Sequence, residues 1–144
     1  MKRVGLLMLV VAVLGCEPGK APLTGTYVLR TIGGDSLPAK WILAGPETVL
    51  ADTLIFEVVL GAKHTNQVEH RFAQREIDGR VLTGSSHEWY TIENGVITLT
   101  FDCPPGYDCI YLPNSAAMRG DTIVRTWTNP SYRERIYVRI PAKK

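Results

Sequence analysis

From residue 24 onward, the chain consists mainly of short segments in which apolar and polar residues alternate with a period of two. Residues 67–77, for example, place Val68, His70 and Phe72 on one face. This period is typical of a β-strand with one buried face, whereas an amphipathic helix would repeat every 3.6 residues. Residues 39–44 have room for one helical turn, but no longer helical pattern is present, and an all-β domain is therefore predicted.

The predicted strands are separated by tight turns. Asn94 with Gly95 is the strongest hairpin signal, and Asp78 with Gly79 is a second one. Gly84, with the two serines that follow it, is also interpreted as a turn. The predicted strands cover residues 25–32, 53–60, 67–77, 81–83, 87–92, 96–101, 110–112, 122–128 and 132–140.

Regular strands joined by short turns favour an antiparallel up-and-down meander of about eight strands. Such a meander either closes into a small barrel or remains open as a sandwich. Closure removes the exposed sheet edges, and about eight strands enclose either packed side chains or one small ligand. No internal sequence repeat is visible, which disfavours a propeller or a solenoid.

The start of the chain has the organisation of a bacterial export signal. Lys2 and Arg3 precede the uncharged residues 4–14, which at about 1.5 Å per residue are too short to cross a bilayer core of about 30 Å. Gly15 and Cys16 follow directly. The sequence Val-Leu-Gly-Cys resembles the lipobox of bacterial lipoproteins, in which the cysteine thiol is acylated before the signal peptide is removed.

This resemblance implies a lipid anchor on Cys16, and two or more acyl chains hold a protein stably on a membrane. We therefore expect a signal peptide over residues 1–15, a lipidated cysteine with its tether over residues 16–23, and one β-barrel domain over residues 24–144. The predicted location is the bacterial cell envelope, extracytoplasmic. Glu17 replaces the aspartate of the enterobacterial retention signal, which by resemblance favours the outer membrane, facing the periplasm.

The charge distribution gives no indication of a nucleic-acid partner. The chain has 16 basic and 14 acidic residues, and because two of the basic ones lie in the predicted signal peptide, the remainder is formally neutral. Arg133, Arg135 and Arg139 fall in the last predicted strand, where we expect one solvated face. Nucleic-acid binding requires a basic patch or stripe. We expect a monomer without a nucleic-acid partner.

The other two cysteines, Cys103 and Cys109, flank a short segment with two prolines and a glycine that can bend sharply. An oxidising compartment lets a disulfide form between them, and so short a loop contributes only about 2 kcal/mol. We predict a structural disulfide that holds a loop. A redox or metal role is the alternative, but the spacing is not that of a Cys-x-x-Cys pair.

The domain also resembles the lipocalin-like lipoproteins of bacteria, which belong to the calycin group. The residues that carry this likeness are Leu-Thr-Gly-Thr-Tyr at 23–27, Gly-Gly-Asp-Ser-Leu-Pro at 33–38 and an arginine-bearing last strand. Calycins typically have Gly-x-Trp on the first strand and a late arginine that packs across the tryptophan. Gly25 matches this pattern, Tyr27 replaces the tryptophan, and Arg139 is one of three candidates for the arginine.

The sequence does not contain a recognisable catalytic or metal-binding pattern. The histidines are His64, His70 and His87, and His87 with Glu88 does not extend to His-Glu-x-x-His because residue 91 is threonine. Ser86 adjoins His87, but neighbouring residues of a strand point to opposite faces. We expect no enzymatic activity, no metal and no cofactor.

Aromatic residues are spread over the predicted strands at roughly one per strand, and in a barrel they either line a cavity or fill the core. The resemblance to lipocalin-like proteins favours the cavity and a small hydrophobic ligand. The alternative is an envelope protein that binds another protein and has a filled core. The candidate ligand-binding residues are Tyr27, Phe56, Phe72, Trp89, Phe101 and Trp127.

Overall fold

The computed structural model describes residues 23–42, 46–101 and 114–141, so Cys16, Cys103 and Cys109 lie outside the described residues. Over these ranges the chain is all-β, as predicted. The strands are β1 (Gly25–Ile32), β2 (Asp35–Ser36), β3 (Ala39–Lys40), β4 (Thr48–Val58), β5 (Asn66–Arg75), β6 (Val81–Glu93), β7 (Val96–Thr100), β8 (Asn114–Arg119), β9 (Thr122–Trp127) and β10 (Arg135–Arg139).

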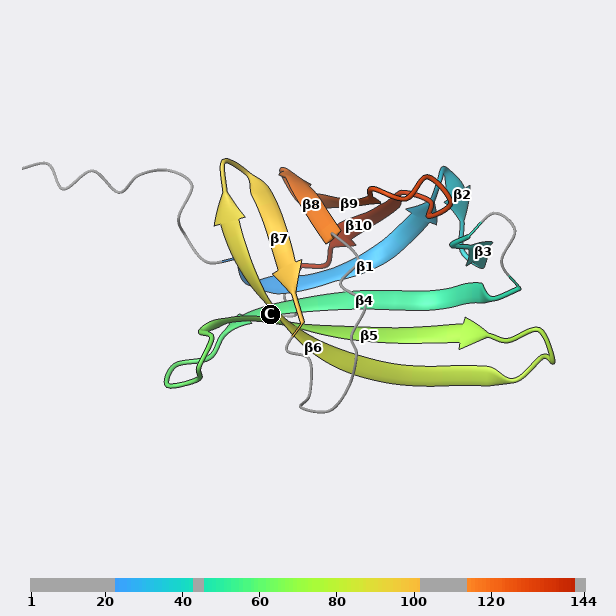
Figure 1. Cartoon of the computed structure of the whole chain (residues 1–144), viewed down its shortest axis with the longest axis horizontal. Coiled ribbons are helices and arrows are strands. Elements are labelled where there is room, and N and C mark those ends of the chain that lie inside the picture. The colour runs from blue at the N-terminus through green and yellow to red at the C-terminus, as the bar shows by residue number, and fades with distance from the viewer. Residues whose placement is uncertain (1–22, 43–45, 102–113, 142–144) are drawn as a thin grey trace, which may run out of the picture.

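The strands form one antiparallel sheet that closes on itself. Its order runs from β1 through β10, β9, β8, β7, β6 and β5 to β4, and β4 pairs again with β1 between Gly25↔Phe56 and Val28↔Thr53. The two short strands β2 and β3 extend from β1 and β4. Figure 1 shows β4, β5 and β6 along one side of this barrel, and β1, β8, β9 and β10 along the other. The predicted meander is confirmed, and its closed form is a barrel.

The hairpin predicted at Asn94 and Gly95 is confirmed and joins β6 to β7. Both residues have positive φ, 52° and 78°, and the flanking Glu93 and Val96 are paired. A two-residue type I′ turn requires this conformation at both central positions, and asparagine followed by glycine adopts it most readily. The local sequence therefore specifies both the turn and the register of these two strands.

The predicted turn at Gly84 is wrong, because β6 runs through it without interruption. Gly84 is paired with Phe72 of β5, and a Cβ atom on Gly84 would lie 2.8 Å from Cζ of the Phe72 ring. The glycine is thus a site of close packing within a strand, where the neighbouring ring occupies the space that a side chain would need.

We expect Gly84→Ala to lower the free energy of unfolding by about 1–3 kcal/mol, because the added methyl group would displace the Phe72 ring. Urea unfolding followed by circular dichroism measures this loss. In the Phe72→Leu background the shorter side chain leaves room, so the same alanine substitution should cost much less. An equal cost in both backgrounds would contradict the packing explanation.

Two further local expectations differ from the structure. Strand β8 was not predicted, because Asn114–Arg119 contains no β-branched or aromatic residue; its pairing with both β7 and β9 imposes the strand. The helical turn at residues 39–44 is not formed over its described part, where Ala39 pairs with Val49 of β4. The predicted strand at 110–112 lies outside the described residues.

Apolar side chains fill most of the interior of the barrel, and the cluster of aromatic rings in this core lies at one end, here called the Leu23 end. This end carries Leu23, the start of β1 and the hairpin between β4 and β5. Phe56 packs edge to face against Tyr27 and Tyr90, with ring centroids 5.6 and 5.2 Å apart. The Tyr90 hydroxyl donates to the Leu23 carbonyl at 2.6 Å. The side chains that are almost completely buried are Tyr27, Ile32, Leu54, Val68, Tyr90, Ile97, Ile123 and Tyr137.

Candidate functional site

The inner face of the barrel changes from apolar to charged toward the opposite end, here called the Trp127 end. On β4, the buried Asp52 lies nearer the Trp127 end than the buried Leu54. On β10, the buried Arg135 lies nearer that end than the buried Tyr137. The same step occurs on two other strands, from Val68 to His70 and from Ile123 to Arg125. Since alternate residues of a strand share a face, these polar side chains enter the barrel together.

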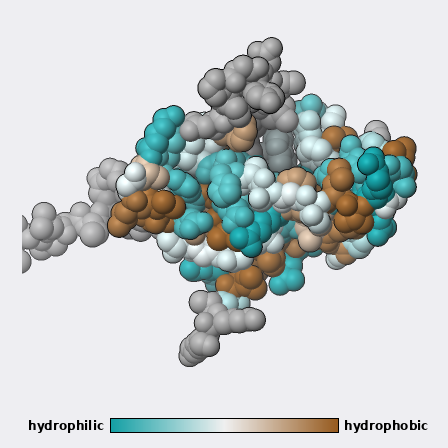
Figure 2. Space-filling view, turned by 90° about the horizontal axis from the view of Figure 1, so that it is seen from below, coloured by the Kyte–Doolittle hydropathy of each residue, from teal (hydrophilic) through white to brown (hydrophobic). Residues whose placement is uncertain are grey.

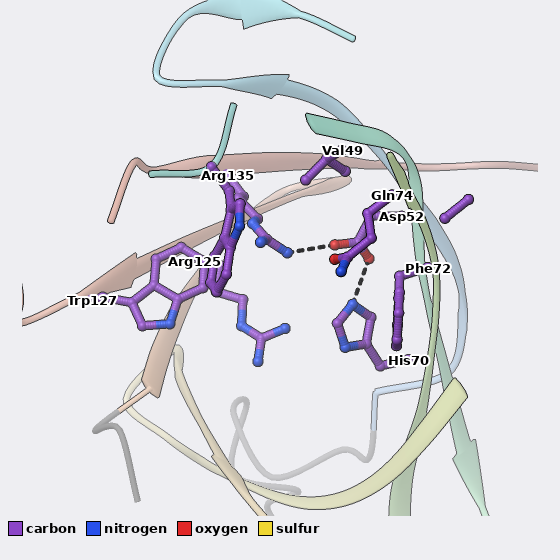
Figure 3. A pocket seen from close by; sticks show the side chains of 10 residues that line it. Val49, Asp52, His70, Phe72, Gln74, Arg125, Trp127 and Arg135 are labelled. Atoms are coloured by element: carbon purple, nitrogen blue, oxygen red, sulfur yellow. Dashed lines mark hydrogen bonds and ion pairs between the residues drawn. The ribbon is translucent and has the colours of Figure 1, made fainter. Parts of the chain in front are cut away.

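Asp52 is the centre of this charged layer and is 3% exposed. Its Oδ2 accepts hydrogen bonds from Nη1 of Arg135 at 2.6 Å and from the Tyr137 hydroxyl at 3.0 Å. Nε2 of His70 lies 2.8 Å from Oδ1. Figure 3 shows the aspartate between the arginine and the histidine. A buried carboxylate requires such partners, because burial without them strongly disfavours the charged form.

These contacts determine the ionisation of the layer. Burial by itself would raise the pKa of Asp52, but the contacts with His70, Arg135 and Tyr137 outweigh it and hold that pKa below its ordinary value of 3.8. Burial, followed by the nearby Asp52 carboxylate, raises the pKa of Tyr137 to about 12. Tyr137 is therefore a protonated donor to an ionised Asp52 at neutral pH.

A second acidic residue, Glu88 of β6, extends the layer. Its Oε1 lies 3.9 Å from Nδ1 of His70, and its Oε2 lies 3.6 Å from Nη2 of Arg125. His70 thus has a carboxylate beside each ring nitrogen. Arg125 and Arg135 are 5% and 7% exposed, an unusual degree of burial for arginine.

The charged layer opens into a cavity of about 200 Å³ at the Trp127 end. Aromatic side chains form much of its wall. The Arg125 guanidinium lies 5.5 Å from the ring centroid of Trp127, and that of Arg135 lies 5.2 Å from the centroids of both Trp127 and Trp41. Trp41 and Trp127 are partly exposed, so the cavity reaches the surface beside them. Its lining residues are Trp41, Val49, Asp52, His70, Phe72, Ala73, Gln74, Arg125, Trp127 and Arg135.

The lowered pKa of Asp52 predicts how the stability of the barrel depends on pH. A carboxyl group whose pKa is lower in the folded state stabilises that state above its unfolded pKa, and this contribution is lost as the pH falls through the folded pKa. Urea unfolding of the wild type and of Asp52→Asn should therefore differ most above about pH 5 and converge at lower pH. A difference that stays constant down to pH 2 would contradict the ionised pair.

The aromatic residues predicted to bind a ligand are distributed over three environments. Phe72 and Trp127 line the cavity. Tyr27 and Phe56 belong to the apolar core at the Leu23 end. The remaining two, Trp89 and Phe101, lie away from both regions.

Trp89 points outward and stacks on His64, with ring centroids 4.3 Å apart and planes inclined by 7°. It lines a second hollow of about 180 Å³ together with His87 and Glu88. Phe101 is 39% exposed at the end of β7. Within the described ranges, no three His, Cys, Asp or Glu side chains are close enough to hold a metal ion.

The sequence analysis missed the charged residues of the cavity. Arg135 was expected on a solvated face, but its buried partner Asp52 holds it inside the barrel. The other two arginines of this segment remain near the surface: Arg133 contacts Asp35 and the Gly33 carbonyl. Arg139 donates to the Thr24 carbonyl at 3.0 Å and lies over Gly25, where a Cβ atom would be 2.9 Å from its Nε.

Apolar residues also occur on the surface. Ile77, Val81 and Leu82 are exposed on the hairpin between β5 and β6, at the Trp127 end, and Leu60 is exposed at the Leu23 end. On the face seen in Figure 2, apolar surface forms separate patches divided by polar surface. No helix in the described part of the chain is long and apolar enough to cross a membrane.

Comparisons of the chain with protein-family models, with curated proteins and with solved structures gave no match. The geometry of the barrel and its cavity is therefore the basis for a functional assignment.

Proposed function

We propose that this protein is a membrane-anchored, extracytoplasmic lipoprotein whose barrel binds a small organic molecule without chemically changing it. The observation that carries the proposal is the cavity of about 200 Å³ with aromatic walls inside a closed barrel. Ligand sites are typically concave and mostly apolar, with a few polar groups that fix orientation. The charged layer beneath the two tryptophans provides such groups.

The barrel is also consistent with the proposed likeness to lipocalin-like proteins. Its eight main strands form a closed antiparallel meander. Arg139 lies over Gly25 and is paired in register with Tyr27, which is the region where calycins place their late arginine. This arrangement supports the choice of Arg139 among the three candidate arginines.

The position of the cavity suits an N-terminal lipid anchor. Leu23, the first described residue, precedes β1 at the end of the barrel opposite to Trp41, which follows β3, and Trp127, which ends β9. An anchor at Cys16 would therefore attach at the end of the barrel farther from the cavity. Cys16→Ser should move the chain from the membrane fraction to the soluble fraction and abolish incorporation of a labelled fatty acid. Unchanged labelling would contradict lipidation at this cysteine.

Native mass spectrometry of the purified full chain tests ligand binding. We expect a co-purifying small molecule at one per chain, or a gain of such mass after incubation with a mixture of small organic compounds. Trp127→Ala should lose this mass because it removes one wall of the cavity, whereas Trp89→Ala, outside the cavity, should retain it.

Absence of any bound mass in the wild type, before and after incubation, would overturn the proposal. It would favour the alternative function, an interaction module of the cell envelope. The exposed Ile77, Val81 and Leu82 on the hairpin at the Trp127 end would then be the first surface to mutate.

A further inference from the structure

The polar groups of the cavity are not balanced between hydrogen-bond donors and acceptors. Oδ2 of Asp52 accepts hydrogen bonds from Arg135 and Tyr137, whereas Oδ1 lies 2.8 Å from Nε2 of His70 without a hydrogen bond between them. Two buried donors, Nε of Arg135 and Nε1 of Trp41, have no hydrogen-bond partner among the described residues. Buried donors are normally satisfied, so the cavity is chemically suited to an occupant that accepts hydrogen bonds.

The cationic groups of the wall favour the same kind of occupant. Two buried arginines, Arg125 and Arg135, line the cavity with a single carboxylate, Asp52. Glu88 lies 3.6 Å from Arg125 and 3.9 Å from His70, but it lines the second hollow. With Glu88 included, the two arginines are matched by two carboxylates, so the attraction for an anion comes from the nearby guanidinium groups and not from a net positive charge of the layer.

The shape and size of the cavity limit the shape and size of the apolar part of a ligand. The indole rings of Trp41 and Trp127 both lie beside the Arg135 guanidinium. In Figure 3, Phe72 lies on the side of the cavity opposite to Trp127, beyond His70 and Asp52. Flat apolar groups pack well against such rings. The volume of about 200 Å³ is smaller than the roughly 300–1,000 Å³ of sites for drug-sized molecules, which excludes a large lipid as a fully enclosed ligand.

From these observations we propose that the cavity binds a small carboxylate carried on a flat apolar body such as an aromatic ring. The carboxylate accepts hydrogen bonds from Arg135 and Trp41, and the ring packs against the aromatic side chains of the cavity wall. This inference rests on the proposed function, because it names the chemical class of the ligand for the same cavity. It changes the expected ligand from a purely hydrophobic molecule to an amphipathic anion.

Three probes of nearly equal shape separate charge from hydrophobicity: 2-naphthoate, 2-naphthamide and 2-naphthylmethylammonium. Isothermal titration calorimetry of the purified full chain at pH 7 gives their dissociation constants. We expect 2-naphthoate to bind at least about tenfold more tightly than the amide, since hydrogen bonds to an ionised acceptor are roughly twice as strong as neutral ones. The ammonium compound should bind most weakly of the three.

The outcomes distinguish this inference from the function on which it rests. If the amide or the ammonium compound binds as tightly as 2-naphthoate, the cavity is a binding site but the anionic class is wrong. If none of the three probes binds and native mass spectrometry finds no ligand, the proposed function fails as well.

A conservative pair of variants tests the residues. Trp41→Phe keeps an aromatic ring but removes the indole N–H, and we expect the affinity for 2-naphthoate to fall about tenfold. The affinity for the amide should fall less. Trp89→Phe removes an indole N–H outside the cavity and should leave both affinities unchanged. Equal losses for acid and amide in Trp41→Phe, or wild-type affinity for the acid, would overturn the assignment of Trp41 as a donor.

Discussion

Asp52→Asn should lower the free energy of unfolding by about 3–5 kcal/mol, the typical cost of removing one member of a buried ion pair. Asparagine has nearly the same shape as aspartate, so packing changes little. The neutral amide leaves the guanidinium of Arg135, only 7% exposed, without its buried counter-charge. It also replaces the ionised acceptor of the Tyr137 hydroxyl. Urea unfolding at pH 7, followed by tryptophan fluorescence, measures the loss.

The control is the same substitution at an exposed aspartate. The Asp121 side chain is 82% exposed and lies 4.0 Å from Arg139, and its replacement by asparagine should change stability by less than about 0.5 kcal/mol. The double variant Asp52→Asn with Arg135→Met removes both buried charges and should be more stable than Asp52→Asn alone. If Asp52→Asn costs no more than Asp121→Asn, the charged layer does not hold the barrel together.

Phe56→Ala should lower the free energy of unfolding by about 3–5 kcal/mol, whereas Phe72→Ala should cost clearly less. Each substitution removes one phenyl ring. Phe56 is 2% exposed and is enclosed by Tyr27 and Tyr90, so its removal leaves a void in a filled core. Phe72 lines the cavity, and a ring that borders empty space has fewer contacting atoms to lose. Urea unfolding of both variants gives the comparison.

This pair of variants tests the division of the barrel into a filled half and a hollow half. Equal losses would mean that Phe72 is packed as tightly as Phe56 and that the cavity is not an open space in solution. The affinity of a dye or probe that binds the wild type gives a second comparison of the two positions. This affinity should be unchanged in a Phe56→Leu variant that still folds, and it should be lower in Phe72→Ala.

Much of the fold follows from local patterns. Period-two alternation located most barrel strands because each strand buries one face, and Asn94 with Gly95 specified its hairpin because both residues adopt positive φ readily. Local patterns did not predict the conformation of segments whose structure depends on a neighbouring strand. Gly84 continues β6 because the Phe72 ring occupies the space beside it, and β8 forms because β7 and β9 both pair with it.

The candidate site was predicted only in its aromatic part, Phe72 and Trp127. A signal for the charged part was present in the sequence. His70 lies between Val68 and Phe72 on an otherwise apolar face, and Arg125 occupies the same kind of position between Ile123 and Trp127. A charged residue on the apolar face of several strands indicates a polar layer, but one such residue read alone suggests only an irregular strand.

By itself, the sequence determined the all-β class and the antiparallel meander, since alternation and turn chemistry act over a few neighbouring residues. Only the tertiary structure decided that Asp52, His70, Arg125 and Arg135 meet inside the barrel. Asp52 and Arg135 are 83 residues apart in the chain, and they meet because β1 pairs with both β10 and β4 and closes the sheet. Closure and register arise from pairing between distant strands, so the charged layer and its cavity exist only in the folded barrel.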